Sequence, residues 1–358
     1  MTDAPPVFSK GRDLEAAAVG LQRWLAPRLG DDAVEVGGFT YPSGAGVSNE
    51  TILFEAHTPS TAAVHELVLR TAPAPEYQMF VDPQFHEQYD LLVKLHGLGT
   101  MRVPEVLWYE DDSAVLGAPF FIMRRMHGRV PVSMPVYNST GWLFDATPAE
   151  RRKLWVSAMH QFAAIHGVPA DEVRVLDRPE RGASGLDQQL RYWWEQATWT
   201  LGQHVPDLIV ELFEWLRANQ PEEPSGLSWG DARIGNMMFD DDYEVVAVID
   251  WEQASMGGGP SDVGWWLFFD DMHSVEVGLE RLDGLSTRQE TIDLWEELTG
   301  LVARDLTWHE AFAGVKAGLL AMRARRVLNL GTVRPDDRNP YLPKVCRLLG
   351  RTVPPEWA

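Results

Sequence analysis

The stretch LSWGDARIGNMMFDDDYEVVAVIDWEQASMGGGPSDVGWW, residues 227–266, decides the fold predicted for this chain. It contains two short apolar runs, 237–239 and 245–249, which are separated by an aspartate-rich turn at 240–242. Short β-forming segments on both sides of such a turn are typical of a β-hairpin. We therefore predict a hairpin here, followed by a buried helix that begins at residue 260.

Three polar side chains stand at the open end of this hairpin. Asp231 and Asn236 come just before the first strand, and Asp250 follows the second strand. A hairpin brings its two ends together, so two carboxylates and an amide are expected at one edge of a small sheet. Mg²⁺ takes carboxylate and carbonyl oxygens and keeps several waters and the substrate phosphates as its other ligands. The pattern predicts an oxygen-ligated Mg²⁺ together with a separate acid or base.

The order D-x-x-x-x-N, hairpin, second Asp resembles the catalytic layout of the protein-kinase-like phosphotransferases. The wording W-G-D-A-R-I-G-N-M-M-F, I-D-W-E and G-G-P-S-D-V-G-W is similar to the aminoglycoside-phosphotransferase-like branch of that group. Within it, the likeness is strongest to bacterial members that share their wording with the kinase-like domains fused to acyl-CoA dehydrogenases. The resemblance implies a two-lobed α+β fold, with a small antiparallel β-sheet lobe and a mainly helical lobe that carries the catalytic hairpin.

The resemblance also implies roles for individual residues. Asp231 would orient the acceptor hydroxyl and take its proton, and Asn236 and Asp250 would hold Mg²⁺ against the phosphates of ATP. Asp262 would brace the catalytic loop from the helix that follows. The family usually has His-Gly-Asp at the catalytic position, whereas this chain has Trp229 in place of the His. Because that His mainly packs and orients the loop, a Trp can fill its position.

Composition places the chain among ordinary globular proteins. Hydrophobic residues make up 45% and charged residues 23% of the 358 positions, a length that suits two unequal lobes. The net charge of −21 disfavours nucleic acid and anionic membranes as partners. It would also steer a cationic substrate, although it serves solubility equally well.

The single cysteine excludes an intramolecular disulfide. No long apolar run or apolar signal core is present, so we expect a cytoplasmic protein.

A glycine-rich turn early in the chain is the candidate phosphate-binding loop. Residues 35–55 supply a strand, the turn and a second strand. Gly44 and Gly46 permit a tight turn with close backbone approach, and Ser48 and Asn49 can donate to phosphate oxygens. A plain hairpin is the alternative, because a glycine loop by itself is a weak signal. The resemblance to kinase-like proteins favours the phosphate-binding interpretation.

Residues 1–123 are predicted to form the nucleotide-binding lobe. Its third strand ends with Arg70, where kinases carry the Lys that touches the α- and β-phosphates of ATP. An Arg can bind phosphate through its planar fork and stays charged; a surface arginine is the alternative. The next helix would supply a polar partner for Arg70, and both Glu87 and Gln88 are candidates for it.

Residues 124–128 are predicted to connect the lobes, and residues 129–358 to form the helical catalytic and substrate lobe. In kinase-like folds the adenine binds backbone groups of the connector, so Arg124 and Met126 are nominated by their main chains. The Pro-rich tail at 333–358 is expected to lie along the surface.

Two further features of the helical lobe are open to more than one interpretation. The acid-rich strip at 276–310 could form the part of an acceptor site that binds the cationic end of the acceptor, or it could be a solvated helix face. His160 and His166 lie on one predicted helix and are interpreted as structural residues rather than metal ligands.

The predicted function is that of a phosphotransferase that moves the γ-phosphate of ATP to an alcohol group of a small molecule. An aminoglycoside is one candidate acceptor, which would imply a role in antibiotic resistance. A different hydroxylated metabolite, such as a compound with an acyl-chain hydroxyl, is the second candidate. A non-catalytic nucleotide-binding module is the alternative from another class, and it is motivated by Trp229 and Arg70.

Overall fold

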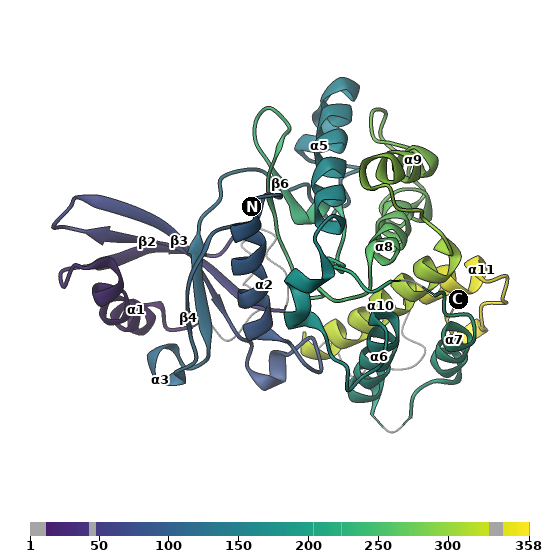
Figure 1. The fold of residues 1–358 in the computed structure, drawn as a ribbon, viewed down its shortest axis with the longest axis horizontal. Helices are drawn as coiled ribbons and strands as arrows, with labels where there is room; N and C mark the ends of the chain where they lie inside the picture. The colour runs from purple at the N-terminus through teal and green to yellow at the C-terminus, as the bar shows by residue number, and fades with distance from the viewer. Residues whose placement is uncertain (1–11, 43–47, 203, 223, 329–338, 358) are drawn as a thin grey trace. The chain divides into compact units, whose positions relative to one another are not determined.

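The structure is a computed structural model that describes residues 12–42, 48–202, 204–222, 224–328 and 339–357. The chain separates into two compact units, Met1–Val93 with Pro104–Met126 and Lys94–Val103 with His127–Ala358. The first unit is built on a β-sheet and the second is mainly helical (Figure 1). The predicted α+β class, with a small antiparallel sheet and a helical part that carries a hairpin, is confirmed.

The first unit contains a five-stranded antiparallel sheet with the strand order β1-β2-β3-β5-β4. The strands are β1 (Glu35–Thr40), β2 (Glu50–Thr58), β3 (Ala63–Thr71), β4 (Val106–Glu110) and β5 (Phe120–Arg124). Residues of β2 alternate between buried and partly exposed positions, as a sheet with one covered face requires. After β3 the chain forms the helix α2 (Phe85–Leu98) and then β4 at the edge of the sheet. The strand β5 follows and pairs between β3 and β4.

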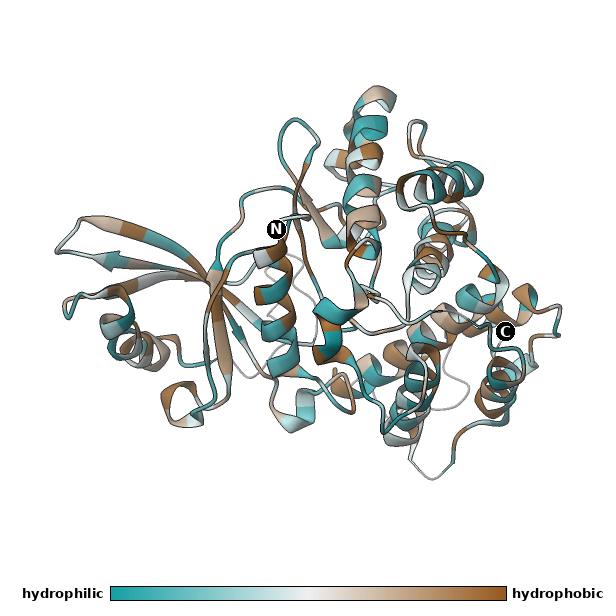
Figure 2. Cartoon of the chain, in the orientation of Figure 1, coloured by the Kyte–Doolittle hydropathy of each residue, from teal (hydrophilic) through white to brown (hydrophobic). Residues whose placement is uncertain are grey.

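The helix α1 (Leu14–Leu29) covers one face of this sheet (Figure 1). It begins at Asp13, whose carboxylate accepts hydrogen bonds from the first free amides of the helix. Leu21 and Leu25 are fully buried and belong to one core with Phe54 and Phe120 of the sheet. Along α1 and the strands, hydrophobic residues are interleaved with hydrophilic ones (Figure 2), which is the pattern of elements with one buried face.

The second unit consists of helices around a two-stranded antiparallel hairpin, β6 (Met237–Phe239) with β7 (Val245–Val248). Its longer helices are α5 (Pro148–His166), α6 (Gly185–Leu201), α7 (Asp207–Ala218), α8 (Gly259–Met272), α9 (Arg288–Thr299) and α10 (Leu306–Val327). Short helices complete it: α4 (Trp142–Asp145) and α11 (Leu342–Leu348). No helix within the described residues combines the length and the apolar character needed to cross a membrane.

The start of α5 shows how local sequence sets an element. Thr147 accepts a hydrogen bond from the amide of Glu150, and the Glu150 carboxylate accepts one from the amide of Thr147. This reciprocal capping box, with Pro148 at the first helical position, satisfies amides that a helix otherwise leaves without partners. The same device begins α6 at Ser184 and α9 at Thr287.

The C-terminal segment corrects one prediction. Residues 339–357 do not all lie along the surface, because Leu342, Val345 and Cys346 of α11 are fully buried. Asn339 anchors the start of this segment, since its amide nitrogen donates to the carbonyl of Gly318 in α10 at 2.9 Å. The many prolines of the tail concealed a short helix with apolar residues at i, i+3 and i+4.

The helices α8 and α10 approach each other closely at Gly264 and His309, where an added Cβ on the glycine would lie 2.5 Å from the Cβ of His309. The His309 ring is 2% exposed, and its Nδ1 lies 3.3 Å from Ser261 Oγ. Burial lowers the pKa of His309 to about 3, and the charge of Lys316 acts in the same direction. His309 is therefore neutral in the folded protein at every pH above about 4.

This burial predicts a pH dependence of stability. Below pH ~6.5 His309 binds a proton in the unfolded chain but not in the folded chain, so the free energy of unfolding falls as the pH falls. Between pH 7.5 and 5.0 the loss from this residue is about 2 kcal/mol. The variant His309→Asn keeps a polar atom near Ser261. We expect its free energy of unfolding, measured with urea, to decrease between pH 7.5 and 5.0 by about 2 kcal/mol less than that of wild type.

Two comparisons make that measurement specific. His273, whose pKa burial lowers to about 4, contributes in the same direction and is still present in the variant, so the dependence will be reduced rather than abolished. The matched control is His160→Asn, because His160 is exposed. An equal drop in stability for His309→Asn and wild type would contradict the prediction.

Candidate active site

Asp231 lies in the loop before β6, with its side chain 14% exposed. Its Oδ1 atom accepts hydrogen bonds from Trp265 Nε1 at 2.9 Å and from Arg233 Nε at 3.1 Å. Both donors approach the same oxygen. No donor among the described residues bonds to Oδ2, so this oxygen stays available for a ligand. The carboxylate is thus fixed on one side and open on the other.

Arg233 is held between two acceptors, because its Nη1 atom also donates to Ser133 Oγ at 2.7 Å. Burial alone would lower the pKa of Arg233, but the neighbouring carboxylate of Asp231 outweighs it and the pKa is raised. The guanidinium therefore stays charged and keeps a positive charge beside Asp231.

Asn236 and Asp250 stand at the two ends of the hairpin, as predicted. The Asn236 side chain donates from Nδ2 to the carbonyl of Asp231 at 2.9 Å, which turns its Oδ1 into the free acceptor end of the amide. The backbone of Asn236 accepts from the amide of Ile249 at 3.0 Å, so Asp250 follows directly after the residue paired with it. Asp250 has a φ of 66°, in the left-handed region that non-glycine residues rarely adopt.

These two residues fit the requirements of Mg²⁺. Asn236 is 4% exposed and presents an amide oxygen, and Asp250 presents a half-buried carboxylate. A site with two protein oxygens suits an ion that keeps waters and substrate phosphates as its remaining ligands. Within the described residues there is no cluster of three or more His, Cys, Asp or Glu that would form an all-protein metal cage. An amide oxygen and a carboxylate are ligands that Mg²⁺ accepts.

Asp262, the fourth residue of α8, braces the loop that carries Asp231. Its Oδ1 accepts from Ser228 Oγ at 2.7 Å and from the amide of Gly230 at 2.8 Å. Its Oδ2 accepts from the amide of Trp229 at 2.6 Å and from His166 Nε2 at 2.9 Å. The carboxylate is 1% exposed, and four donors satisfy it completely.

His166 is a structural residue, as predicted, but it is in direct contact with an acidic side chain. Its Nδ1 atom accepts the indole N–H of Trp295 at 2.8 Å, and an indole nitrogen can only donate. The proton of the ring therefore sits on Nε2, which donates to Asp262. His166 on α5 therefore links Asp262 on α8 to Trp295 on α9.

Trp229 connects the two halves of the site. Its ring is fully buried, and its Nε1 lies 3.0 Å from the carbonyl of Ile249 and 3.2 Å from that of Asp250. The indole therefore ties the loop of Asp231 to the residue after β7. Gly230 makes the turn between them with a φ of 92°, and an added Cβ would lie 2.2 Å from the carbonyl oxygen of Gln253. Only glycine fits at this position.

The predicted nucleotide-contacting residues lie in the first unit. Ser48 and Asn49 are buried immediately before β2, whereas Gly44 and Gly46 lie outside the described residues. Arg70 lies near the end of β3, opposite Thr51 of β2. The remaining two candidates are at the end of β5: the amide of Arg124 donates to the carbonyl of Glu105 at 2.9 Å, and Met126 is the last residue of the unit.

Of the two candidate partners for Arg70, Gln88 is the buried one. It is 5% exposed, and its side-chain nitrogen donates to the carbonyl of Pro83 at 2.8 Å. Glu87 is partly exposed. Which of them pairs with a nucleotide-bound Arg70 stays a prediction.

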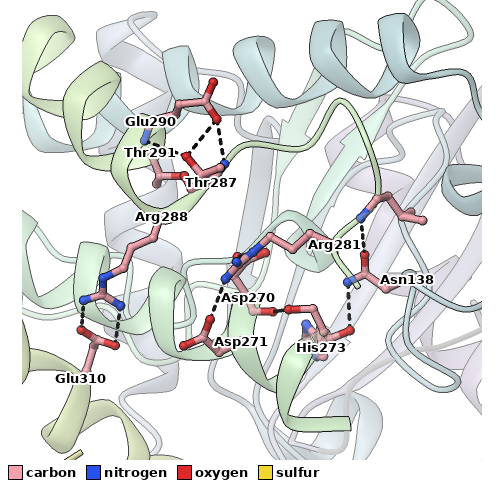
Figure 3. A network of polar contacts seen from close by, with 12 residues as sticks. Asn138, Asp270, Asp271, His273, Arg281, Thr287, Arg288, Glu290, Thr291 and Glu310 are labelled. Atoms are coloured by element: carbon pink, nitrogen blue, oxygen red, sulfur yellow. Dashed lines mark hydrogen bonds and ion pairs between the residues drawn. The ribbon is translucent and has the colours of Figure 1, made fainter. Parts of the chain in front are cut away.

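A polar network surrounds the C-terminal end of α8 (Figure 3). Arg281 binds both Asp270 and Asp271, while Asn138 donates to the carbonyl of His273 at 2.9 Å. A cavity of about 20 Å³ lies between this network and the catalytic loop. It is lined by Tyr137, Trp155, Arg233, Ile234, Trp266, Asp270, His273, Leu285, Ser286 and Thr291. Its volume suits one water or one hydroxyl-sized group.

Part of the acid-rich strip at 276–310 is paired within its own unit. Glu310 forms a two-pronged ion pair with Arg288, and Glu290 caps its helix through Thr287 (Figure 3). Glu276 lies 3.6 Å from Lys344 and also binds Arg347. These three carboxylates have partners within the unit, and the strip holds six further acidic residues.

Sequence reasoning missed the two donors that fix Asp231. Trp265 follows it by 34 residues and Arg233 by two, and neither stood out from its neighbours in type. The only available signal for Arg233 was a cation placed inside the catalytic motif itself. Trp265 was one of fifteen tryptophans, and only its packing distinguishes it.

The fold is that of the kinase-like phosphotransferases. The family model described as "Phosphotransferase enzyme family", APH, matches residues 42–301. The chain belongs to this family.

Individual relatives agree with this assignment. "Probable acyl-CoA dehydrogenase IBR3" of Arabidopsis thaliana is 29% identical over 231 residues, which cover 62% of this chain and 27% of that protein. The chain spans about a quarter of the length of such curated relatives. The predicted likeness to kinase-like domains of acyl-CoA dehydrogenase family members is confirmed.

Solved structures show the same fold at low identity. A Ralstonia eutropha protein proposed to be an aminoglycoside phosphotransferase superposes with a TM-score of 0.65 at 22% identity, over 94% of this chain and 95% of that one. An APH protein in complex with GDP and kanamycin gives a TM-score of 0.53 at 14% identity, over 86% of this chain and 93% of that one.

Proposed function

We propose that this chain transfers the γ-phosphate of ATP to a hydroxyl group of a small molecule. The observation that carries the proposal is the one-sided fixation of Asp231, whose Oδ1 is held by Trp265 and Arg233 while Oδ2 is open. A carboxylate oxygen that is open and held in one orientation can act as a general base that receives a proton from an acceptor hydroxyl.

The proposed transfer is a single phosphoryl-transfer step. The acceptor O–H donates to Asp231 Oδ2, the acceptor oxygen forms a bond to the γ-phosphorus, and the bond from that phosphorus to the β–γ bridging oxygen breaks. ADP leaves with the electron pair of the broken bond, and the acceptor proton passes to Asp231 and then to solvent. In such reactions the protein mainly positions the partners and neutralises charge.

Asn236 Oδ1 and the Asp250 carboxylate would hold Mg²⁺, which when bound would neutralise charge on the phosphates. The hydrogen bond from Asn236 to the Asp231 carbonyl would keep the metal-binding amide and the proton acceptor in a fixed relation. The proposed nucleotide contacts are Gly44, Gly46, Ser48, Asn49, Arg70, Arg124 and Met126.

The charge around Asp231 is compatible with both candidate acceptors. Arg233 places a cation beside the carboxylate, but this cation is already paired with Asp231. The strip at 276–310 holds nine acidic residues, of which Glu276, Glu290 and Glu310 have a basic partner. An aminoglycoside and another hydroxylated metabolite, including a hydroxyacyl compound, are therefore both candidate acceptors.

A coupled ADP-release screen separates these possibilities. We expect Mg²⁺-dependent turnover with at least one hydroxylated compound, and the ratio of kcat/KM between aminoglycosides and other metabolites matched for the number of hydroxyl groups assigns the acceptor class. The screen includes Asp231→Ala as the background of each compound. Equal turnover of wild type and Asp231→Ala on every compound would contradict the proposal.

The same assay distinguishes an enzyme from a nucleotide-binding module. An enzyme should show slow Mg²⁺-dependent ATP hydrolysis without acceptor, and this hydrolysis should vanish in Asp231→Ala. A non-catalytic module would show stabilisation by ATP in thermal unfolding and no hydrolysis in either protein.

A further inference from the structure

Lys316 is a cation enclosed by aromatic rings in the interior of the second unit. It lies in the middle of α10 and is 6% exposed. Its Nζ atom is 4.6 Å from the ring centroid of Trp265, 5.3 Å from that of Phe312 and 5.7 Å from that of Trp193. Among the described residues no carboxylate comes within ion-pair distance of it. The three ring centroids lie within 5.7 Å of the ammonium group, and the charges of Asp262 and Asp231 also act on it.

This location is costly for a lysine. Desolvation lowers its pKa to about 8, even though the charges of Asp262 and Asp231 act in the opposite direction. The side chain is still mostly charged at neutral pH, and an unpaired buried charge destabilises a fold. A methionine would fill the same space without that cost. Packing therefore gives no reason for a lysine at this position.

One of the three rings leads directly to the catalytic carboxylate. Trp265 receives the Lys316 cation over its face and donates its indole N–H to Asp231 Oδ1. A cation over the face of an indole is attracted by the ring quadrupole and holds the ring in place. It also draws electron density out of the ring, which makes the N–H a stronger donor. Lys316 and Asp231 thus act on opposite parts of the same side chain.

We propose that Lys316 is a positioning residue for the proposed phosphotransfer: through the Trp265 indole it holds Asp231 Oδ1 and keeps Oδ2 directed to the acceptor hydroxyl. It does not touch the reacting atoms. The inference rests on the proposed function of Asp231, and it adds a requirement outside the motifs of the catalytic loop and the hairpin.

The test is a double-mutant cycle on kcat with Lys316→Met and Trp265→Phe. We expect Lys316→Met to lower kcat by roughly tenfold, the order of effect of a desolvated cation–π contact. The KM for ATP should change less than twofold, and Tm should be unchanged or higher because no charge is buried. Trp265→Phe should lower kcat at least as much. Where the indole carries the effect, the double variant should be no slower than Trp265→Phe, whereas a direct effect of the Lys316 charge on Asp231 would make the two losses additive.

The matched control is Arg323→Met on the same helix. Arg323 lies over the ring of Trp199 at 3.9 Å, seven residues along α10 from Lys316, and is 7% exposed against 6% for Lys316. Its removal should leave kcat within twofold of wild type. This control separates loss of a cation–π contact in general from loss of the one that reaches Asp231.

Each other outcome would overturn the inference. Equal kcat in Lys316→Met and wild type would remove its functional basis, and so would additive losses in the double variant. A second neutral variant, Lys316→Gln, covers the case of poor folding: a Tm lower by about 5 °C or more in both neutral variants would assign Lys316 to stability. Absence of turnover in the wild type on every acceptor would instead defeat the proposed function.

Discussion

Asp231→Asn is expected to lose roughly 10²- to 10⁴-fold in kcat, the usual contribution of a positioned general base. The substitution is nearly isosteric. The amide oxygen of an Asn can still accept from Trp265 and Arg233, so the fixed side of the carboxylate is preserved. The group in place of Oδ2 becomes an NH₂, which donates and cannot take a proton. The loss should therefore fall on the chemical step and not on folding.

The measurement is a coupled ADP assay with an acceptor identified in the screen, together with thermal unfolding with and without Mg²⁺-ATP. We expect the stabilisation by Mg²⁺-ATP to persist in the variant, because Asp231 has no proposed contact with the nucleotide. Asp241→Asn is the matched control, since it makes the same change on a fully exposed side chain at the tip of the hairpin. Wild-type turnover in Asp231→Asn would rule out this residue as the base.

The hairpin and its polar residues could be predicted because all the necessary information is local. The two strands are separated by a turn in which Asp240 Oδ1 accepts from the amides of Asp242 and Glu244, both at 2.9 Å. A short aspartate side chain that bonds its own backbone is a recognisable turn signal. Once the turn is fixed, the ends of the strands meet, and Asn236 and Asp250 come together.

The donors around the site could not be predicted because their partners are distant in sequence. His166 lies 96 residues before Asp262, and Lys316 lies 51 residues after Trp265. Hydrophobic periodicity indicates that a helix has a buried face, but it does not indicate which polar side chain on that face will meet which partner. Trp265 and Trp266 are both buried, and only one of them donates to Asp231.

The C-terminal helix illustrates a different kind of failure. Leu342, Val345 and Cys346 have the spacing of a helix face, and they are buried. The weight given to prolines in the tail outweighed that signal, although Pro343 occupies a first-turn position where a missing N–H costs nothing. A proline marks a helix start as readily as a loop, so its position relative to the apolar residues is what decides.

Asp262→Asn is expected to destabilise the chain by roughly 3–5 kcal/mol, the range for breaking a buried charged network. Asp262 receives two donors on each oxygen, and each side includes one backbone amide: Gly230 on one side and Trp229 on the other. Whichever way the Asn amide turns, its NH₂ faces one of these amides. A backbone N–H cannot reverse its role, so at least one buried donor is left without an acceptor.

The neighbouring side chains cannot repair this defect. Ser228 can rotate its hydroxyl, but His166 cannot exchange its proton between nitrogens, because Trp295 already donates to Nδ1. We expect urea unfolding of the full chain to show the loss, and kcat to fall as well because the loop of Asp231 is no longer held. Asp293→Asn on α9, where the exposed carboxylate bonds among the described residues to Gln289, should stay within about 0.5 kcal/mol of wild type. A loss below about 1 kcal/mol in Asp262→Asn would mean that the loop is held by its backbone pairing with Ser255 rather than by this carboxylate.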